Sequence, residues 1–184
     1  DLLFISNLYT RAKRGRDAIE TANQALSLAS GTERRQIAKT TLATALQTNG
    51  DPAAAERVLR EVLHEVPGNT MALNNLGFFL TERGERLDEA VRLITQALKV
   101  DPENPSYLDS LGWAYLWLGR LDDAEKYLTD AVRFDPDSST IREHLGDMYR
   151  QKKDPEKAKA MWEAALRMSA DAEDAGRLKK KLGR

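Results

Sequence analysis

Apolar and small side chains recur along this chain with the spacing of amphipathic helices. In one segment Leu108, Leu111, Gly112 and Tyr115 fall on one arc when each residue is turned by about 100°, so this face of a helix is expected to be buried. The next segment repeats this spacing with Ala124, Leu128, Ala131 and Val132. The pattern predicts two amphipathic helices joined by a short turn.

This pair of helices is repeated along the chain at a spacing of about 34 residues. The copy 70–104 has one extra residue between its helices, which is expected to lengthen the turn only. The clearest copy fills the places of the repeat with Leu108, Leu111, Gly112, Tyr115, Ala124, Leu128, Ala131 and Pro136. The chain divides into a partial repeat, four further repeats and a closing helix, with boundaries at 1–32, 36–69, 70–104, 105–138, 139–172 and 173–184.

Glycine occupies the same place in the first helix of three successive copies, at Gly77, Gly112 and Gly146. Inside a helix, glycine costs roughly 1 kcal/mol relative to alanine, so its recurrence needs a reason in packing. Close approach of the paired helix is that reason, because the matching place of the second helix holds Ala90, Ala124 and Ala158. The two helices of each pair are expected to nest at these positions.

Proline marks the ends of several helices. Two helix starts are predicted where a capping carboxylate precedes a proline, at Asp51-Pro52 and Asp154-Pro155. Because the residue before proline is pushed out of the helical region, second helices are expected to end at Val66-Pro67, Asp101-Pro102 and Asp135-Pro136. Ten antiparallel helices result, and the fold class is all-α.

An eleventh helix is expected from about Asp171 to Leu182. It has acidic residues at its start and the lysines 179–181 at its end, which suits the helix dipole. Leu178 and Leu182 are expected to cover the last repeat. Solubility and the dipole account for the basic end of the chain, which is therefore not interpreted as a lipid or nucleic-acid site.

These residues resemble the tetratricopeptide repeat family over essentially the whole chain. The resemblance implies a right-handed superhelical α-solenoid of helix-turn-helix repeats with a C-terminal capping helix. It also implies a non-catalytic scaffold that binds a protein or peptide in its concave groove. The runs that begin at Asn74, Asp109 and His144 further resemble the C-terminal repeats of bacterial envelope and lipoprotein adaptors. That likeness implies a periplasmic or outer-membrane-associated home, while a cytoplasmic location stays open.

The first helices of the repeats are expected to line the groove. Phe78, Trp113 and Trp117 are predicted to form an apolar patch, with Asp109, Glu143 and Asp147 as an acidic rim. Such a surface would favour a basic or amphipathic segment of a partner. The expected groove residues are Asn74, Phe78, Asp109, Trp113, Leu116, Trp117, Glu143, Asp147 and Arg150.

A structural alternative stays open for part of this patch, because Trp113 and Phe78 could instead fill the seam between adjacent first helices or lie under the C-terminal helix. Trp162 lies at a core place of its helix and is expected to pack inside. Relatives that bind a chaperone's C-terminal carboxylate carry a clamp of lysine, asparagine and further basic residues. The equivalent places here hold other residues, among them Asp109 with Trp113 and Glu143 with Asp147, so that clamp is absent.

Composition narrows the chemistry. The 28 Lys and Arg residues nearly balance the 29 Asp and Glu residues, so no long-range field favours nucleic acid or an anionic membrane. The chain has no cysteine, and no apolar run reaches the roughly 20 residues of a membrane span. His64 and His144 lie in different repeats without recurring partners. No catalytic residue, cofactor site or metal site is predicted.

Three functions remain open. The first is an adaptor whose groove recruits another protein. The second is a self-assembly module that forms a homo-oligomer through an open repeat end or through the Trp113 patch. The third is an accessory domain of a larger enzyme, because Asp1 lies within an expected helix and the sequence is interpreted as a fragment. A removed signal peptide or lipid anchor is compatible with the same observation.

Overall fold

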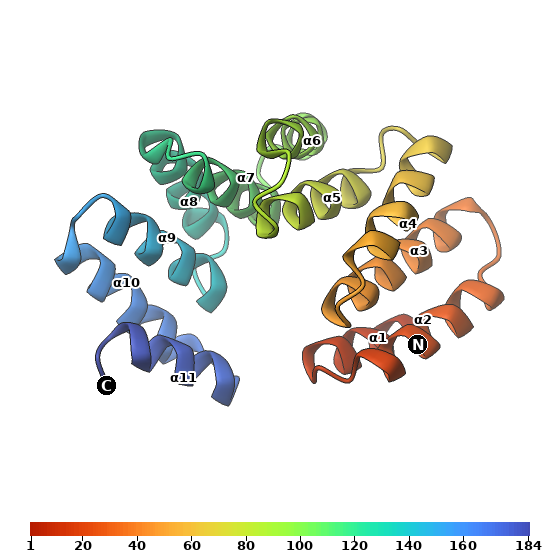
Figure 1. The fold of residues 1–184 in the computed structure, drawn as a ribbon, viewed down its shortest axis with the longest axis horizontal. Coiled ribbons are helices and arrows are strands. Elements are labelled where there is room, and N and C mark those ends of the chain that lie inside the picture. Colours follow the sequence, from red (N-terminus) through yellow and green to blue (C-terminus); the bar gives the residue numbers. More distant parts are fainter.

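The computed structural model describes residues 1–184 and consists of α-helices without a β-strand (Figure 1). The all-α prediction is therefore confirmed, including the eleventh helix. The helices are α1 (Leu2–Arg11), α2 (Gly15–Leu28), α3 (Thr32–Thr48), α4 (Pro52–Glu65), α5 (Thr70–Glu82), α6 (Leu87–Val100), α7 (Pro105–Trp117), α8 (Leu121–Phe134), α9 (Ser139–Gln151), α10 (Pro155–Met168) and α11 (Ala172–Lys181).

Local signals explain most helix ends. Asp51 and Asp154 cap α4 and α10 through side-chain oxygens that accept the backbone N–H groups of Ala54 and Lys157. The helices α4, α6 and α8 end immediately before the expected X-Pro positions. Helix α3 begins at Thr32, four residues ahead of residue 36, where the sequence analysis starts the second repeat. Gly31, with a φ of 82°, reverses the chain just ahead of that extra turn.

The helices form a solenoid that curves into an arc and brings the red and blue ends of the chain towards each other (Figure 1). Each odd-numbered helix up to α7 contacts the next odd-numbered one, whereas the even-numbered helices lack comparable contacts with each other. Since helices on the inside of a curved stack lie closer together, α1, α3, α5, α7 and α9 form the concave wall.

The glycines allow the paired helices to nest as predicted. A Cβ atom added at Gly112 would lie 2.6 Å from Cγ of Leu128 on the partner helix. At Gly146 it would lie 2.5 Å from Cδ1 of Trp162, whose side chain is buried as expected. These distances are shorter than any normal contact, so only glycine fits at these close approaches.

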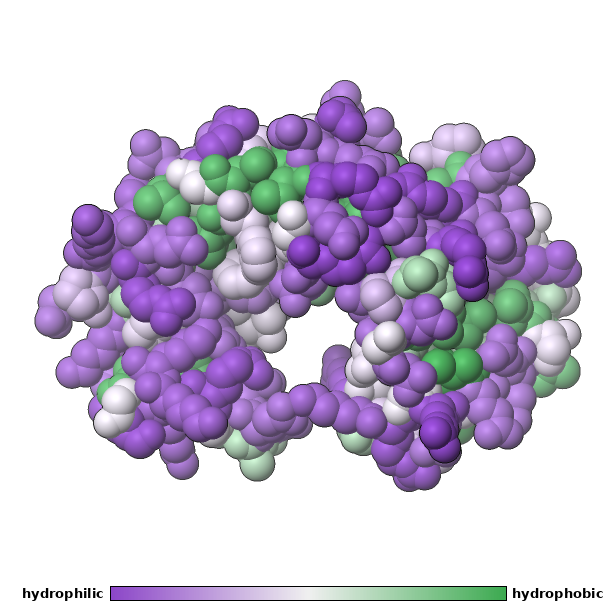
Figure 2. Space-filling view, viewed as in Figure 1, coloured by the Kyte–Doolittle hydropathy of each residue, from purple (hydrophilic) through white to green (hydrophobic).

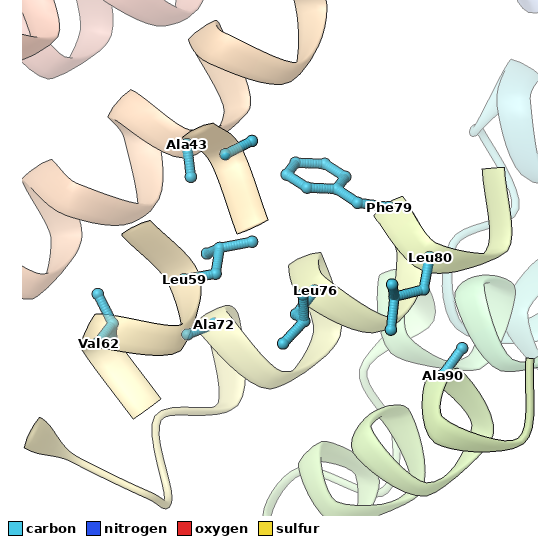
Figure 3. Close-up of a cluster of buried hydrophobic side chains, with 9 residues drawn as sticks. Ala43, Leu59, Val62, Ala72, Leu76, Phe79, Leu80 and Ala90 are labelled. Carbon is cyan, nitrogen blue, oxygen red and sulfur yellow. The ribbon is translucent and has the colours of Figure 1, made fainter. Parts of the chain in front are cut away.

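The core is continuous from one repeat to the next. One buried cluster combines residues of α3, α4, α5 and α6, among them Ala43, Leu59, Leu76 and Leu80 (Figure 3). Because each helix contributes to the packing of its neighbours on both sides, a repeat is stable only within the stack.

The turn between α5 and α6 holds the extra residue, which lengthens the loop as predicted. Gly84 and Arg86 take left-handed backbone conformations there, with φ values of 64° and 47°. Arg83 and Arg86 each lie 2.7 Å from Glu56 on α4, which holds the longer turn against the preceding pair of helices. Burial raises the pKa of Glu56, but hydrogen bonds from Arg86, Arg83 and Arg60 outweigh it and lower the pKa to about 2.

Candidate functional site

Two tryptophans of α7 stand at the concave wall. Their ring centroids lie 6.5 Å apart with the rings nearly perpendicular. Trp117 is 47% exposed and is the more open of the two. Its ring also covers the α5–α6 turn, because a Cβ atom at Gly84 would lie 3.2 Å from Cζ3 of Trp117. A pocket of about 320 Å³ opens beside these rings and is lined by Trp113, Leu116, Trp117, Gly119 and Gln151.

Trp113 is held from both sides. Its indole N–H donates a hydrogen bond of 2.7 Å to Glu82 on α5. Its ring stacks on the imidazole of His144 on α9, with centroids 4.2 Å apart. Trp113 therefore spans the seam between three first helices, which is the geometry of the structural alternative. Phe78 likewise packs partly buried against the cluster of Figure 3.

His144 acquires a partner that the sequence analysis did not foresee. Its Nδ1 atom lies 2.8 Å from Oδ1 of Asp109, and Asp109 is only 7% exposed. Burial lowers the pKa of His144, but the charge and the hydrogen bond of Asp109 outweigh burial and raise the pKa above its usual value. Asp109 and His144 are about one repeat apart in the sequence, and this spacing indicates that they lie on neighbouring first helices.

The acidic rim expected around the aromatic patch is wrong, because α11 neutralises it. Arg177 approaches Glu143 to 2.7 Å, and Lys181 lies 2.6 Å from Asp147 and 2.7 Å from Glu143. Both carboxylates are buried. Burial raises the pKa of Glu143, but hydrogen bonds from Arg177 and Lys181 outweigh it and hold the pKa at about 2.

The position of α11 explains this pairing. Arg177 and Lys181 lie 34 residues after Glu143 and Asp147, so α11 takes the place of a further first helix. Arg177 and Lys181 are four positions apart in the sequence, as are Glu143 and Asp147. Each pair therefore lies on one face of its helix. The 34-residue spacing of the repeats, continued beyond residue 172, places Arg177 and Lys181 at the positions that correspond to Glu143 and Asp147.

The remaining expected groove residues differ in accessibility. Leu116 lines the pocket but is only 3% exposed and packs with Leu145 and Met148, so it belongs mainly to the core and not to an open groove surface. Asn74 is buried as well, and its side-chain oxygen has no hydrogen-bond partner in the chain. Arg150 is exposed and lies over the ring of Trp162 at 5.6 Å. Trp117 and Arg150 are thus the exposed members of the expected set, whereas Phe78 and Trp113 are partly buried.

Two other features, a metal site and a membrane-spanning helix, were also considered in the structure. No three His, Asp or Glu side chains are grouped as metal ligands would be. None of the helices combines the length and the apolar character needed to cross a membrane.

Comparison with known proteins adds a relative in sequence. The TPR repeat-containing protein PA4667 of Pseudomonas aeruginosa is 45% identical to the chain over 67 residues. The match covers 36% of this chain and 11% of that protein, so the chain spans about a tenth of the relative's length.

Solved structures share the fold. TTC0263, a thermophilic TPR protein of Thermus thermophilus, superposes with a TM-score of 0.85 at 21% identity, over 100% of this chain and 98% of that one. PilF of Pseudomonas aeruginosa superposes with a TM-score of 0.69 at 21% identity, over 99% and 83% of the two chains. A family model described as tetratricopeptide repeat matches residues 40–85, 80–139 and 110–175, well over half of the chain. This chain therefore belongs to the tetratricopeptide repeat family.

Proposed function

We propose that the chain is a non-catalytic scaffold whose concave wall binds an amphipathic segment of another protein, with Trp117 as the principal anchor. Tetratricopeptide arrays serve in general as scaffolds for protein–protein interaction. The observation that carries the proposal is a half-exposed tryptophan beside a pocket of about 320 Å³. Tryptophan is enriched among the residues that dominate binding energies at interfaces.

The surroundings of Trp117 make it a fixed anchor. Its ring rests on the turn at Gly84 and meets the edge of Trp113, which Glu82 and His144 hold in turn. A side chain that is already ordered loses little conformational entropy when a partner covers it. Trp113 and Trp117, which these contacts order, also line the neighbouring pocket.

Charge suggests which ligands fit. The expected preference for a basic segment depended on a free acidic rim, but Asp109, Glu143 and Asp147 are paired within the fold. The pocket itself presents apolar rings and the amide of Gln151. We therefore expect a ligand that inserts an apolar side chain into the pocket while its polar groups face Gln151 and solvent.

A partner captured with the intact chain provides the test. Its affinity is measured for the wild type, for Trp117→Ala and for Leu28→Ala, because Leu28 is another exposed apolar residue, on α2. We expect Trp117→Ala to weaken binding at least tenfold, about 1.4 kcal/mol, while Leu28→Ala leaves it unchanged. Thermal unfolding of each variant serves as the control for folding. Equal affinity of the wild type and Trp117→Ala would refute the proposal.

A further inference from the structure

The first helix presents an apolar face that nothing in the chain covers. Phe4, Ile5 and Leu8 lie within five residues of each other on α1 and are 63%, 38% and 46% exposed. Isolated apolar residues are normal on a protein surface, but a cluster of three large ones on one helix face marks a docking surface.

The repeat register shows that this face is normally an internal one. Ser6 takes the glycine place of its repeat, and its hydroxyl donates a hydrogen bond of 2.8 Å to the carbonyl of Ala18 on α2. In that register the places of Ile5 and Leu8 are at most 8% exposed in every later repeat. They are occupied by Leu42 and Ala45, Leu76 and Phe79, Leu111 and Ala114, and Leu145 and Met148.

The later repeats also show what covers such a face. Leu111 and Ala114 of α7 pack against Ile94 of α6, with Val91 and Leu98 of α6 beside it. The same packing recurs where α8 meets α9 and where α4 meets α5. In each case the covering element is the second helix of the preceding pair. It carries two aliphatic residues four positions apart, Ile94 and Leu98 in α6, Leu59 and Leu63 in α4, and Leu128 and Val132 in α8.

The opposite end of the array is finished differently. There α11 buries Leu178 completely and exposes Lys179 and Lys180 to solvent. Repeat arrays need such polar outer faces at their ends to stay soluble. The chain thus has one capped end and one end with the surface of an internal repeat.

We propose that the face of Phe4, Ile5 and Leu8 binds a helical pair of the tetratricopeptide type, whose second helix carries aliphatic residues at positions i and i+4. Such a pair would extend the stacking contact that the chain already forms between its own repeats. A second copy of the chain fits less well. Two α1 faces would place Phe4, Ile5 and Leu8 against their own copies, and neither copy would supply the second helix that covers this place in the later repeats.

A fusion tests whether the face accepts this helix. Residues 70–106, which comprise α5, α6 and the following connection, are joined ahead of Asp1 of the intact chain, so that the added second helix stands one repeat before α1. We expect Leu8→Gln to lower the thermal midpoint by about 4 °C or more in the fusion, and by far less in the unfused chain. Leu28→Gln, at an exposed residue of α2, is the matched control with a small effect in both backgrounds.

Equal small effects of Leu8→Gln in the fused and unfused chains would overturn the proposal. The unfused chain is also examined by sedimentation across a range of concentrations. A monomer is the expected result. A dimer that dissociates when Phe4 and Leu8 are replaced by glutamine would overturn it in favour of a second copy on this face.

Discussion

At the residue scale, the small side chains of the repeat fix how closely the helices approach. The prediction from Gly77, Gly112 and Gly146 is confirmed, because side chains of the partner helix fill the space that a Cβ atom would need. The sequence alone indicates this packing, because glycine destabilises a helix and its recurrence at one place of the repeat is best explained by close approach of a second helix.

This packing predicts opposite effects for two glycine substitutions. Gly112→Ala is expected to lower the free energy of unfolding by about 1–3 kcal/mol, because the new methyl group meets Leu128. Gly176 lies in α11 with no atom near its missing Cβ, so Gly176→Ala is expected to raise the free energy by up to about 1 kcal/mol. Urea unfolding of both variants measures this, and equal effects would contradict the packing account.

The Asp109–His144 pair predicts a dependence on alkaline pH. Because the folded protein raises the pKa of His144, the pair stabilises the fold fully below the usual histidine value of about 6.5. That contribution is lost as the pH rises through the raised pKa. Urea unfolding between pH 6 and pH 9 should therefore show decreasing stability. His144→Gln should flatten the profile, and a profile that is the same in both proteins would count against the pair.

At the element scale, the chain signals most helix ends but not every contact of the helices. Asp-Pro and X-Pro positions predict the ends of α4, α6, α8 and α10 because capping and φ restriction are local effects. The pairing of α11 with Glu143 and Asp147 joins residues 34 apart and depends on how far the stack continues. Local patterns therefore predicted α11 itself, but they placed Glu143 and Asp147 on an exposed rim and not in contact with this helix.

The salt bridges of α11 predict its release in acid. The lowered pKa of Glu143, about 2, means that its contribution to stability is complete above the usual value of 4.5 and is lost as the pH falls from there towards 2. Hydrogen exchange corrected for intrinsic rates should show α11 opening in this range before α9 and α10. Glu143→Gln should open α11 already at neutral pH, and undiminished protection in that variant would contradict this account.

At the scale of the whole molecule, the arc almost closes into a ring. Side chains reach across the gap between the two ends and border an open centre (Figure 2), and Lys13 pairs there with Glu173 of α11. Both side chains are more than half exposed, and exposed ion pairs contribute little. The concave wall is accessible through the open centre (Figure 2). The envelope location implied by the sequence stays a prediction.

Reversing one charge tests how the ring is closed. Lys13→Glu is expected to widen the distance between labels on the α1–α2 turn and on α11, as measured by electron spin resonance, because two carboxylates would face each other. Lys153→Glu is the matched control, since both lysines occupy left-handed turn positions, with φ values of 55° and 60°. The thermal midpoints of the two variants should be similar. Equal label distances in both variants would show that the ion pair plays no part in closing the ring.

The indole N–H signals of Trp113 and Trp117 probe the concave wall directly, and the indole of buried Trp162 serves as the internal control. A nuclear magnetic resonance titration with the bound segment of a captured partner should shift the Trp117 indole signal most. Signals of Gly119 and Gln151 should move with it, while buried Trp162 stays unchanged. Shifts confined to the even-numbered helices, with the Trp117 signal unmoved, would contradict binding at the concave wall.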